Sequence, residues 1–286
     1  IYKGLKPVYW CTECGTALAE AEIEYEDDPC YSIYVKFNVT DDKGVFSGMG
    51  IDPKDVYFVI WTTTTWTLPG NVAICLGPNY EYTLVKTGGQ YLVMAKDLVS
   101  AAMKDAKIDD YETVGSFLGS DLEYIKTAHP FLDRESLVIV GDHVTLESGT
   151  GCVHTAPGHG VEDFEVCQNY KDIPVIVPVD SEGKLTELAG EFAGLSTDDA
   201  NKAIAKKLDA AKNRFCSARP NSGSAQSMDL KIKPLKRSAA LTGFRNGAKS
   251  VSKVWCVTAA TGVFPVSVPG VCRSRFCIVK IAVSRL

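Results

Sequence analysis

The stretch GTGCVHTAPGHGVEDF at residues 149–164, together with TTTTWTLPGN at residues 62–71, decides most of what this sequence predicts. The first stretch carries His154 on a glycine- and proline-rich segment that leads to Asp163 at an acidic helix start. The second stretch presents consecutive hydroxyl groups and then Asn71. Neither stretch holds a strong nucleophile or a complete set of metal ligands. Such a composition predicts a pocket for a small polar substrate, whose amino group a carboxylate holds and whose oxygens hydroxyls hold.

Short apolar or alternating segments separated by turn residues predict a strand-rich α+β fold. The expected strands are residues 31–39, 56–62, 80–87, 91–94, 137–140, 143–147, 152–155 and 175–179. The expected helices are residues 95–106, 162–170 and 197–211. Many short strands with few helices are typical of a closed or distorted barrel with helices packed outside.

The charge of the chain is divided unevenly. Residues 1–212 carry 17 Lys and Arg against 34 Asp and Glu, a net charge of -17, and residues 213–286 carry 13 against one, a net of +12. A basic tail of this kind is typical of a disordered arm or a nucleic-acid-binding segment. No apolar run reaches the length of a membrane span, so no membrane partner is expected.

The two quoted stretches resemble the editing domain of the isoleucyl-tRNA synthetases, which hydrolyses valyl-tRNA made in error. GTGxVHxAPxHGxxDF is shared loosely with the valyl and leucyl enzymes, whereas TTTxWTLPxN is closer to the isoleucyl branch. Residues 3–25 resemble the zinc-knuckle segment that leads into this domain, and residues 178–204 resemble its exit. The resemblance implies a linker with half a zinc knuckle at residues 1–28 and a distorted β-barrel editing domain at residues 29–212.

The resemblance also implies roles for two charged or titratable side chains. Asp163 would bind the ammonium group of the substrate, and His154 would line the amino-acid pocket, where it excludes isoleucine and admits valine. Without the motif, an Asp at a helix start is often only a helix cap and a lone His is often structural. His159 occupies a motif position that is typical of a structural residue, and His129 and His143 have no motif support.

The threonine stretch is expected to hold the rest of the substrate. By resemblance, Thr62, Thr63 and Thr64 would bind the terminal adenosine, the ester and the attacking water, and Asn71 would add a contact. Threonines also favour strand ends for purely structural reasons. Thr65 departs from the family, in which proline is usual, and this change is expected to loosen the loop. The expected catalytic residues are Thr62, Thr63, Thr64, His154 and Asp163.

Cys11 and Cys14, in WCTEC, form half of a tetrahedral zinc site or simply a pair of free thiols. The family supplies its second CxxC after the exit helix, and that segment is absent here. No HIGH, KMSKS or P-loop motif is present. We therefore expect no cofactor for editing, and zinc and ATP-Mg only in the intact parent enzyme.

The basic tail has a sharper interpretation. The family segments FRATEQWFCSVDGFK and DRSDWCISRQRTWGVP, back-translated and read one base late, can give residues 217–231 and 258–273 of this chain. We therefore expect residues 213–286 to be an aberrant tail, out of frame from about residue 215 and disordered or non-native. Sequencing of the coding DNA tests this hypothesis.

The sequence as a whole predicts a cytoplasmic fragment of an isoleucine-tRNA ligase, since it begins at Ile1 and resembles the interior of a longer protein. Its expected activity is hydrolysis of valyl-tRNA, and the parent would charge tRNA with isoleucine using ATP. Its expected partners are the 3′ acceptor end of tRNA and the rest of the parent, and it is expected to be monomeric. The alternatives are an inactive module that binds the tRNA acceptor end and a zinc-ribbon interaction module.

Overall fold

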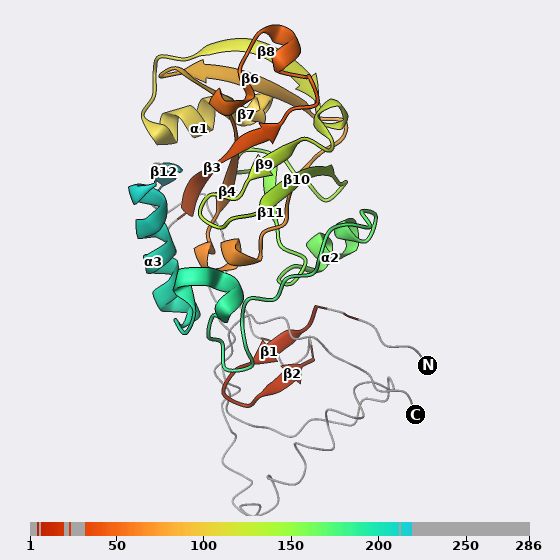
Figure 1. Ribbon diagram of the computed structural model, residues 1–286, viewed down its shortest axis with the longest axis vertical. Coiled ribbons are helices and arrows are strands. Elements are labelled where there is room, and N and C mark those ends of the chain that lie inside the picture. The colour runs from red at the N-terminus through yellow and green to blue at the C-terminus, as the bar shows by residue number, and fades with distance from the viewer. Residues whose placement is uncertain (1–4, 6, 20–22, 24–31, 212, 219–286) are drawn as a thin grey trace, which may run out of the picture.

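The structure, a computed structural model, describes residues 5, 7–19, 23, 32–211 and 213–218. Its main sheet has the strand order β12-β3-β9-β10-β5-β11-β4-β7-β6-β8, and a further pairing of β3 with β4 closes the strands from β3 to β4 into a barrel (Figure 1). These strands are β3 (Ser32–Asp41), β4 (Val56–Thr62), β5 (Ala73–Leu76), β6 (Glu81–Thr87), β7 (Gln90–Ala95), β8 (Glu112–Leu118), β9 (Lys126–Ala128), β10 (Glu135–Val140), β11 (Cys152–Thr155) and β12 (Arg214–Ala218). The strand-rich barrel predicted from the sequence is confirmed.

The barrel interior is built from alternate residues of the long strands. Side chains of a strand point to opposite faces in turn, so one set enters the core and the other faces outward. Tyr34 and Val59 belong to the outward set and pack against α1 (Val99–Ala106). The inward set of β3 and β4 consists of Ile33, Val35, Phe37, Val39, Val56, Phe58 and Ile60.

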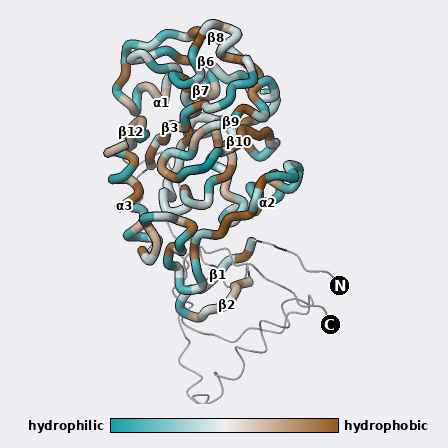
Figure 2. The backbone as a smooth tube through the Cα atoms, in the orientation of Figure 1, coloured by the Kyte–Doolittle hydropathy of each residue, from teal (hydrophilic) through white to brown (hydrophobic). Residues whose placement is uncertain are grey.

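Two further helices cover other faces of the barrel. α2 (Val161–Cys167) packs its Val166 and Cys167 against β5 and β10. α3 (Thr197–Ala210) begins where Ser196, one of the two caps that the sequence allows beside Thr197, accepts a hydrogen bond from the backbone of Asp199. Figure 2 shows hydrophilic and hydrophobic residues mixed along α3, because its apolar stripe faces the core while its other side meets solvent.

The remaining elements are short. β1 (Tyr9–Cys11) and β2 (Thr16–Leu18) form a small hairpin apart from the main sheet, and Trp10 of this hairpin donates from Nε1 to Ser181 O at 2.9 Å. In the described ranges the 3-10 helices are η2 (Ser47–Met49), η3 (Pro53–Asp55), η4 (Thr65–Gly70), η5 (Lys96–Leu98), η6 (Gly119–Leu122) and η7 (Glu187–Phe192). No helix within the described ranges is both long enough and apolar enough to cross a membrane.

Two of the predicted strands are wrong. Residues 143–147 form a loop in which Val144 is buried. The apolar side chain of Val144 therefore fixes the loop to the core, and the segment is not a strand. Residues 175–179 also form no strand, and only Val179 makes an isolated bridge, with Leu185. Pro178 lies within this segment, and a proline cannot donate to a strand ladder.

Strand β12 lies beyond residue 212, the expected end of the editing domain. It pairs antiparallel with β3, with a shift in register between Arg214 and Cys216. Strand pairing uses backbone groups, so it accepts many side-chain sequences. The origin of the tail stays a prediction, and residues 219–286 lie outside the described residues.

Candidate active site

The threonine stretch begins at the end of β4 and runs into η4. Thr62 is buried, and its hydroxyl accepts a hydrogen bond from the backbone N–H of Thr64 at 3.2 Å. The Thr64 hydroxyl lies 3.4 Å from that of Thr67. Thr63 is partly exposed, and in the described part of the chain its side chain makes no hydrogen bond. The hydroxyls of Thr62 and Thr64 thus contact the loop itself, whereas the Thr63 hydroxyl has no partner among the described residues.

Both ring nitrogens of His154 are hydrogen-bonded to this loop. Asn71 Nδ2 lies 2.7 Å from His154 Nδ1, and Thr67 Oγ1 lies 3.0 Å from His154 Nε2. Asn71 Nδ2 also donates to Ala73 O at 2.9 Å, and since a carbonyl can only accept, this bond fixes the orientation of the amide. His154 Nδ1 is therefore the acceptor, and the ring carries its proton on Nε2 and donates it to Thr67.

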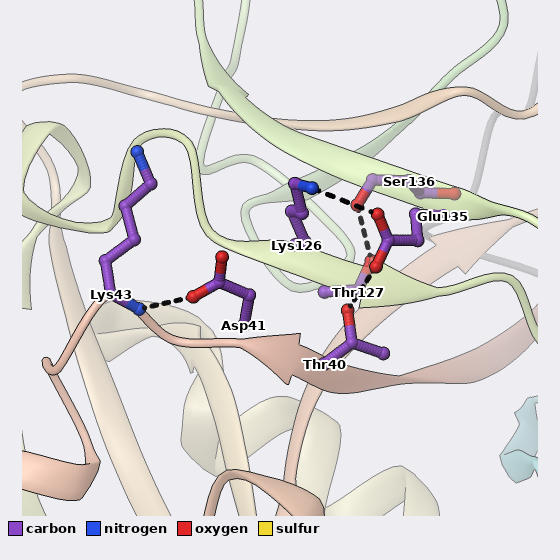
Figure 3. A network of polar contacts seen from close by, with 7 residues as sticks. All are labelled: Thr40, Asp41, Lys43, Lys126, Thr127, Glu135 and Ser136. Carbon is purple, nitrogen blue, oxygen red and sulfur yellow. Dashed lines mark hydrogen bonds and ion pairs between the residues drawn. The ribbon is translucent and has the colours of Figure 1, made fainter.

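The same network extends into the barrel wall. The buried Ser136 donates from Oγ to Asn71 Oδ1 at 2.6 Å, which leaves both ends of the amide bonded. The backbone oxygen of Ser136 accepts from Thr127 Oγ1 at 2.9 Å. Figure 3 shows this second bond beside the contacts of Glu135 with Thr40 and Lys126, which join β3, β9 and β10. The orientation of His154 is therefore linked through Asn71 to Ser136 on β10, whose backbone is in turn bonded to Thr127 on β9.

Burial keeps His154 neutral. Loss of hydration disfavours the charged ring and lowers the pKa of His154 to about 3. The ring is consequently uncharged at neutral pH, and its only acceptor nitrogen is occupied by Asn71. It is suited to shaping a pocket wall and donating a hydrogen bond, and not to general acid or base catalysis.

Asp163 lies in the first turn of α2, at the end of the motif. Its Oδ2 accepts a hydrogen bond from the backbone N–H of Ala156 at 2.9 Å. A Cβ on Gly160 would lie 2.9 Å from the same oxygen, so the glycine leaves room for the carboxylate to fold back. Burial raises the pKa of Asp163, and the hydrogen bond from Ala156 partly opposes this rise. No ion pair among the described residues involves Asp163.

The structure joins some of the predicted residues directly and others only through the backbone. Thr62, Thr64, Asn71 and His154 belong to one hydrogen-bonded group together with Thr67 and Ser136. Asp163 makes no hydrogen bond to this group within the described chain. It is held instead at Ala156, two residues past His154, where β11 has just ended.

Thr65 is bonded to α3, a contact that the sequence did not suggest. Its hydroxyl lies 2.9 Å from both the backbone oxygen and Oδ1 of Asn201, and Trp66 N donates to the same Oδ1 at 2.9 Å. Ser136 was also missed, although a lone serine in the apolar strand ESLVIV is a signal of a buried polar contact.

The cysteine pair does not fit a zinc site by itself. A structural zinc needs four ligands, and Cys11 and Cys14 supply two. Both are disulfide-bonded, and no cluster of three or more His, Cys, Asp or Glu that could hold a metal occurs among the residues described. Whether the parent enzyme completes the site stays a prediction.

The sequence over residues 1–230 matches the family model described as tRNA synthetases class I (I, L, M and V). The chain belongs to this family. Among curated synthetases, the isoleucine–tRNA ligase of Caldicellulosiruptor saccharolyticus is 65% identical over 210 residues, which are 73% of this chain and 23% of that ligase. The isoleucine–tRNA ligase of Thermoanaerobacter sp. (strain X514) is 57% identical over 208 residues, 73% of this chain and 22% of that ligase. This synthetase chain therefore matches less than a quarter of the length of these relatives.

Solved structures resemble the chain in fold. The crystal structure of GlLeuRS-CP1 superposes with a TM-score of 0.53 at 15% identity and covers 66% of this chain and 100% of that one. The editing domain of the cytosolic leucyl-tRNA synthetase of P. knowlesi gives a TM-score of 0.51 at 10% identity and covers 66% and 97%. The barrel of this synthetase chain thus has the fold of a synthetase editing domain.

Proposed function

We propose that the barrel hydrolyses the ester of valine attached in error to the isoleucine tRNA. The observation that carries this proposal is the half-buried Asp163 carboxylate, whose pKa is raised by burial and which forms no ion pair among the described residues; the nearby His143 ring opposes this rise only in part. A shielded carboxylate is costly unless a cation joins it. The α-ammonium of an aminoacyl group supplies that charge and would relieve the cost on binding.

The remaining groups of the site suit the rest of an aminoacyl ester. The hydroxyls of Thr62, Thr63 and Thr64 would hold the terminal adenosine, the ester oxygens and the attacking water. His154 is held in one orientation by Asn71 and would act as a wall that admits valine and excludes isoleucine. Such a second selection is needed because one methylene discriminates by only about 1–3 kcal/mol in a single binding step.

Hydrolysis in this site would depend on positioning and not on a general base. Water held next to the ester by fixed hydroxyls gains from proximity, and neutral donors can stabilise the developing oxyanion. His154 does not accept the proton of the water, because its Nδ1 already accepts from Asn71. A hydroxyl group of the substrate's own ribose would assist.

The partner of this site would be the 3′ acceptor end of tRNA carrying valine. The net charge of -17 over residues 1–212 favours contact limited to that end over binding along an RNA backbone. Charging of tRNA with isoleucine, ATP-Mg and zinc would belong to the longer, cytoplasmic parent enzyme, and this chain would act as a monomer.

The test is deacylation of valyl-tRNA by the full chain and by Asp163→Asn, which removes the charge and keeps the shape. Loss of one charge-assisted contact worth about 1.5–3 kcal/mol should lower kcat/KM by about 10- to 150-fold. Glu162→Gln is the matched control, because Glu162 is the exposed neighbour on the same turn, and it should hydrolyse at the wild-type rate.

Unchanged hydrolysis by Asp163→Asn would refute the role of the carboxylate. Binding of tRNA by the wild-type chain without hydrolysis would favour the alternative, an inactive module that recognises the acceptor end.

A further inference from the structure

Asn201 lies at the junction of α3 and the threonine loop. Its Oδ1 accepts from Thr65 Oγ1 and from Trp66 N, each at 2.9 Å, and its backbone oxygen is also 2.9 Å from the Thr65 hydroxyl. One side chain therefore receives both the side chain and the backbone of the first turn of η4. These contacts join residues more than 130 positions apart in the chain.

α3 is a rigid base for this contact. Three residues on its inner face are fully buried in the main core, together with Leu68 of η4: they are Ala200, Ile204 and Leu208. Capping by Ser196 fixes the start of the helix. The position of Asn201 is thus set by the core, and η4 is bonded to a fixed point.

The start of η4 determines where the hydroxyls of the threonine stretch lie. Thr67 N donates to Thr64 O at 3.2 Å and Thr67 Oγ1 donates to the same oxygen at 2.8 Å, so these two residues move together. Thr65 lies between them, and Thr67 is the partner of His154 Nε2. A displacement at Thr65 would therefore shift the hydroxyls and the histidine contact at once.

We propose that Asn201 is a positioning residue for the threonine loop, holding η4 so that the hydroxyls of residues 62–64 meet the ester and its water while Thr67 stays bonded to His154. The inference rests on the proposed hydrolysis for its effect on rate. It also assigns a role to Thr65, whose hydroxyl restrains the loop from outside by bonding to α3.

A proline at position 65 should be able to replace this restraint. Thr65 is the first residue of η4, where a proline ring fits the helix, and no hydrogen bond of the described residues uses its backbone N–H. The ring would fix φ internally, in place of the bond to Asn201. Hydrogen bonding to α3 and a proline ring are thus two routes to the same ordered loop.

The experiment compares four forms of the full chain: wild type, Asn201→Leu, Asn201→Asp and Asn201→Leu with Thr65→Pro. Asn201→Leu should lower kcat for valyl-tRNA by about 10- to 100-fold with KM changed less than about twofold, because misplacement of reacting groups acts on the chemical step. Asn201→Asp keeps the acceptor oxygen and should stay within about threefold of wild type. Adding Thr65→Pro to Asn201→Leu should restore most of the lost rate.

A second readout does not depend on hydrolysis. Hydrogen exchange at the backbone amides of Thr67 and Asn71, which close turns of η4, should speed up by about tenfold or more in Asn201→Leu and slow again with Thr65→Pro. Lys202→Ala, an exposed change on the same helix, should alter neither measurement. If Asn201→Leu leaves the chain unfolded, Thr65→Val removes only the hydroxyl and should give an intermediate effect on both.

The two proposals fail in different ways. If wild type does not hydrolyse valyl-tRNA but exchange follows the expected order, the proposed function is wrong and the role of Asn201 stands. If Asn201→Leu matches Lys202→Ala in rate and in exchange, the positioning role is overturned whatever the activity.

Discussion

His154 and His159 stand five residues apart in one motif and have opposite surroundings. Both nitrogens of His154 are hydrogen-bonded, to Asn71 and Thr67. Neither nitrogen of His159 has a hydrogen-bond partner among the residues that the structure describes, and its ring packs edge-on against Trp66 with the ring centroids 5.1 Å apart. A Cβ on Gly70 would lie 2.8 Å from the His159 ring, so the backbone of η4 also presses against it.

Charge does not distinguish these two histidines. Burial lowers the pKa of His154 to about 3 and that of His159 to about 4, so both rings are neutral at pH 7. The difference is that His154 has its tautomer specified, whereas His159 serves as an aromatic spacer under the loop. A pocket that selects a substrate by shape needs a wall in a fixed position, and of these two rings His154 is the one that hydrogen bonds hold in one orientation.

The largest effect should come from His154→Ala. Removal of the wall should let isoleucyl-tRNA be hydrolysed at least about tenfold faster than by wild type, because the methylene that the wall excludes then fits. Deacylation rates with valyl- and isoleucyl-tRNA measure the change in preference. The free energy of unfolding should also fall by about 1–3 kcal/mol, since Asn71 and Thr67 lose a partner.

The matched control is His159→Ala, which should keep the preference for valyl-tRNA even if it lowers stability. If both variants change the preference equally, the contrast between the two rings has no bearing on selection.

A smaller effect is expected from Ser136→Ala. The Ser136 hydroxyl donates to Asn71 Oδ1 and so helps to orient this amide. Loss of the hydroxyl should lower the free energy of unfolding by about 1–2 kcal/mol and the rate of hydrolysis by a few-fold. Urea unfolding and kcat measure the two quantities. Thr40→Ala, in the exposed contact with Glu135 seen in Figure 3, should change both much less. A Ser136→Ala variant as stable and active as wild type would show that His154 is oriented without this support.

The sequence predicted those parts of the molecule whose signals are local. β4 and β11 begin and end where their apolar patterns do, and α3 begins at one of the two caps that the sequence allows, Ser196 and not Thr197. The strands predicted at residues 143–147 and 175–179 failed because an apolar pattern records burial and does not show whether a partner strand is present.

The candidate site was predictable only as far as its motifs reach. Residues 62–64, Asn71 and His154 were expected near one another, and hydrogen bonds link most of them. Ser136 and Asn201 act across long sequence separations, and no local pattern encodes such contacts. The loosening expected from Thr65 stays a prediction, but its bond to Asn201 offers a physical reason for the opposite outcome.

The smallest effect at pH 7 should come from His159→Phe. The ring has no hydrogen bonds to lose within the described chain, and phenylalanine can keep the edge contact with Trp66, so stability should change by less than about 1 kcal/mol and hydrolysis should not change. Urea unfolding and valyl-tRNA deacylation at pH 7 check both statements. A large loss of activity would place His159 in the site after all.

Acidic pH should magnify this variant's effect with a defined sign. The pKa of His159 is about 4 in the folded chain against an ordinary value of 6.5, so between these values the unfolded chain binds the extra proton. The neutral ring's contribution to stability is complete above pH 6.5 and is lost as the pH falls towards 4. His159→Phe removes this loss. The free energy of unfolding of the variant minus that of wild type should therefore be about 2 kcal/mol larger at pH 5 than at pH 7. His129 titrates in both proteins, so its contribution cancels in this difference, whereas the loss of the His159 charge also relieves part of the lowering of the pKa of His154 and so changes stability in the same direction. If the free energies of unfolding of the two proteins depend equally on pH, His159 is protonated equally in the folded and unfolded chains. The contrast between the two histidines would then rest on the hydrogen bonds of His154 alone.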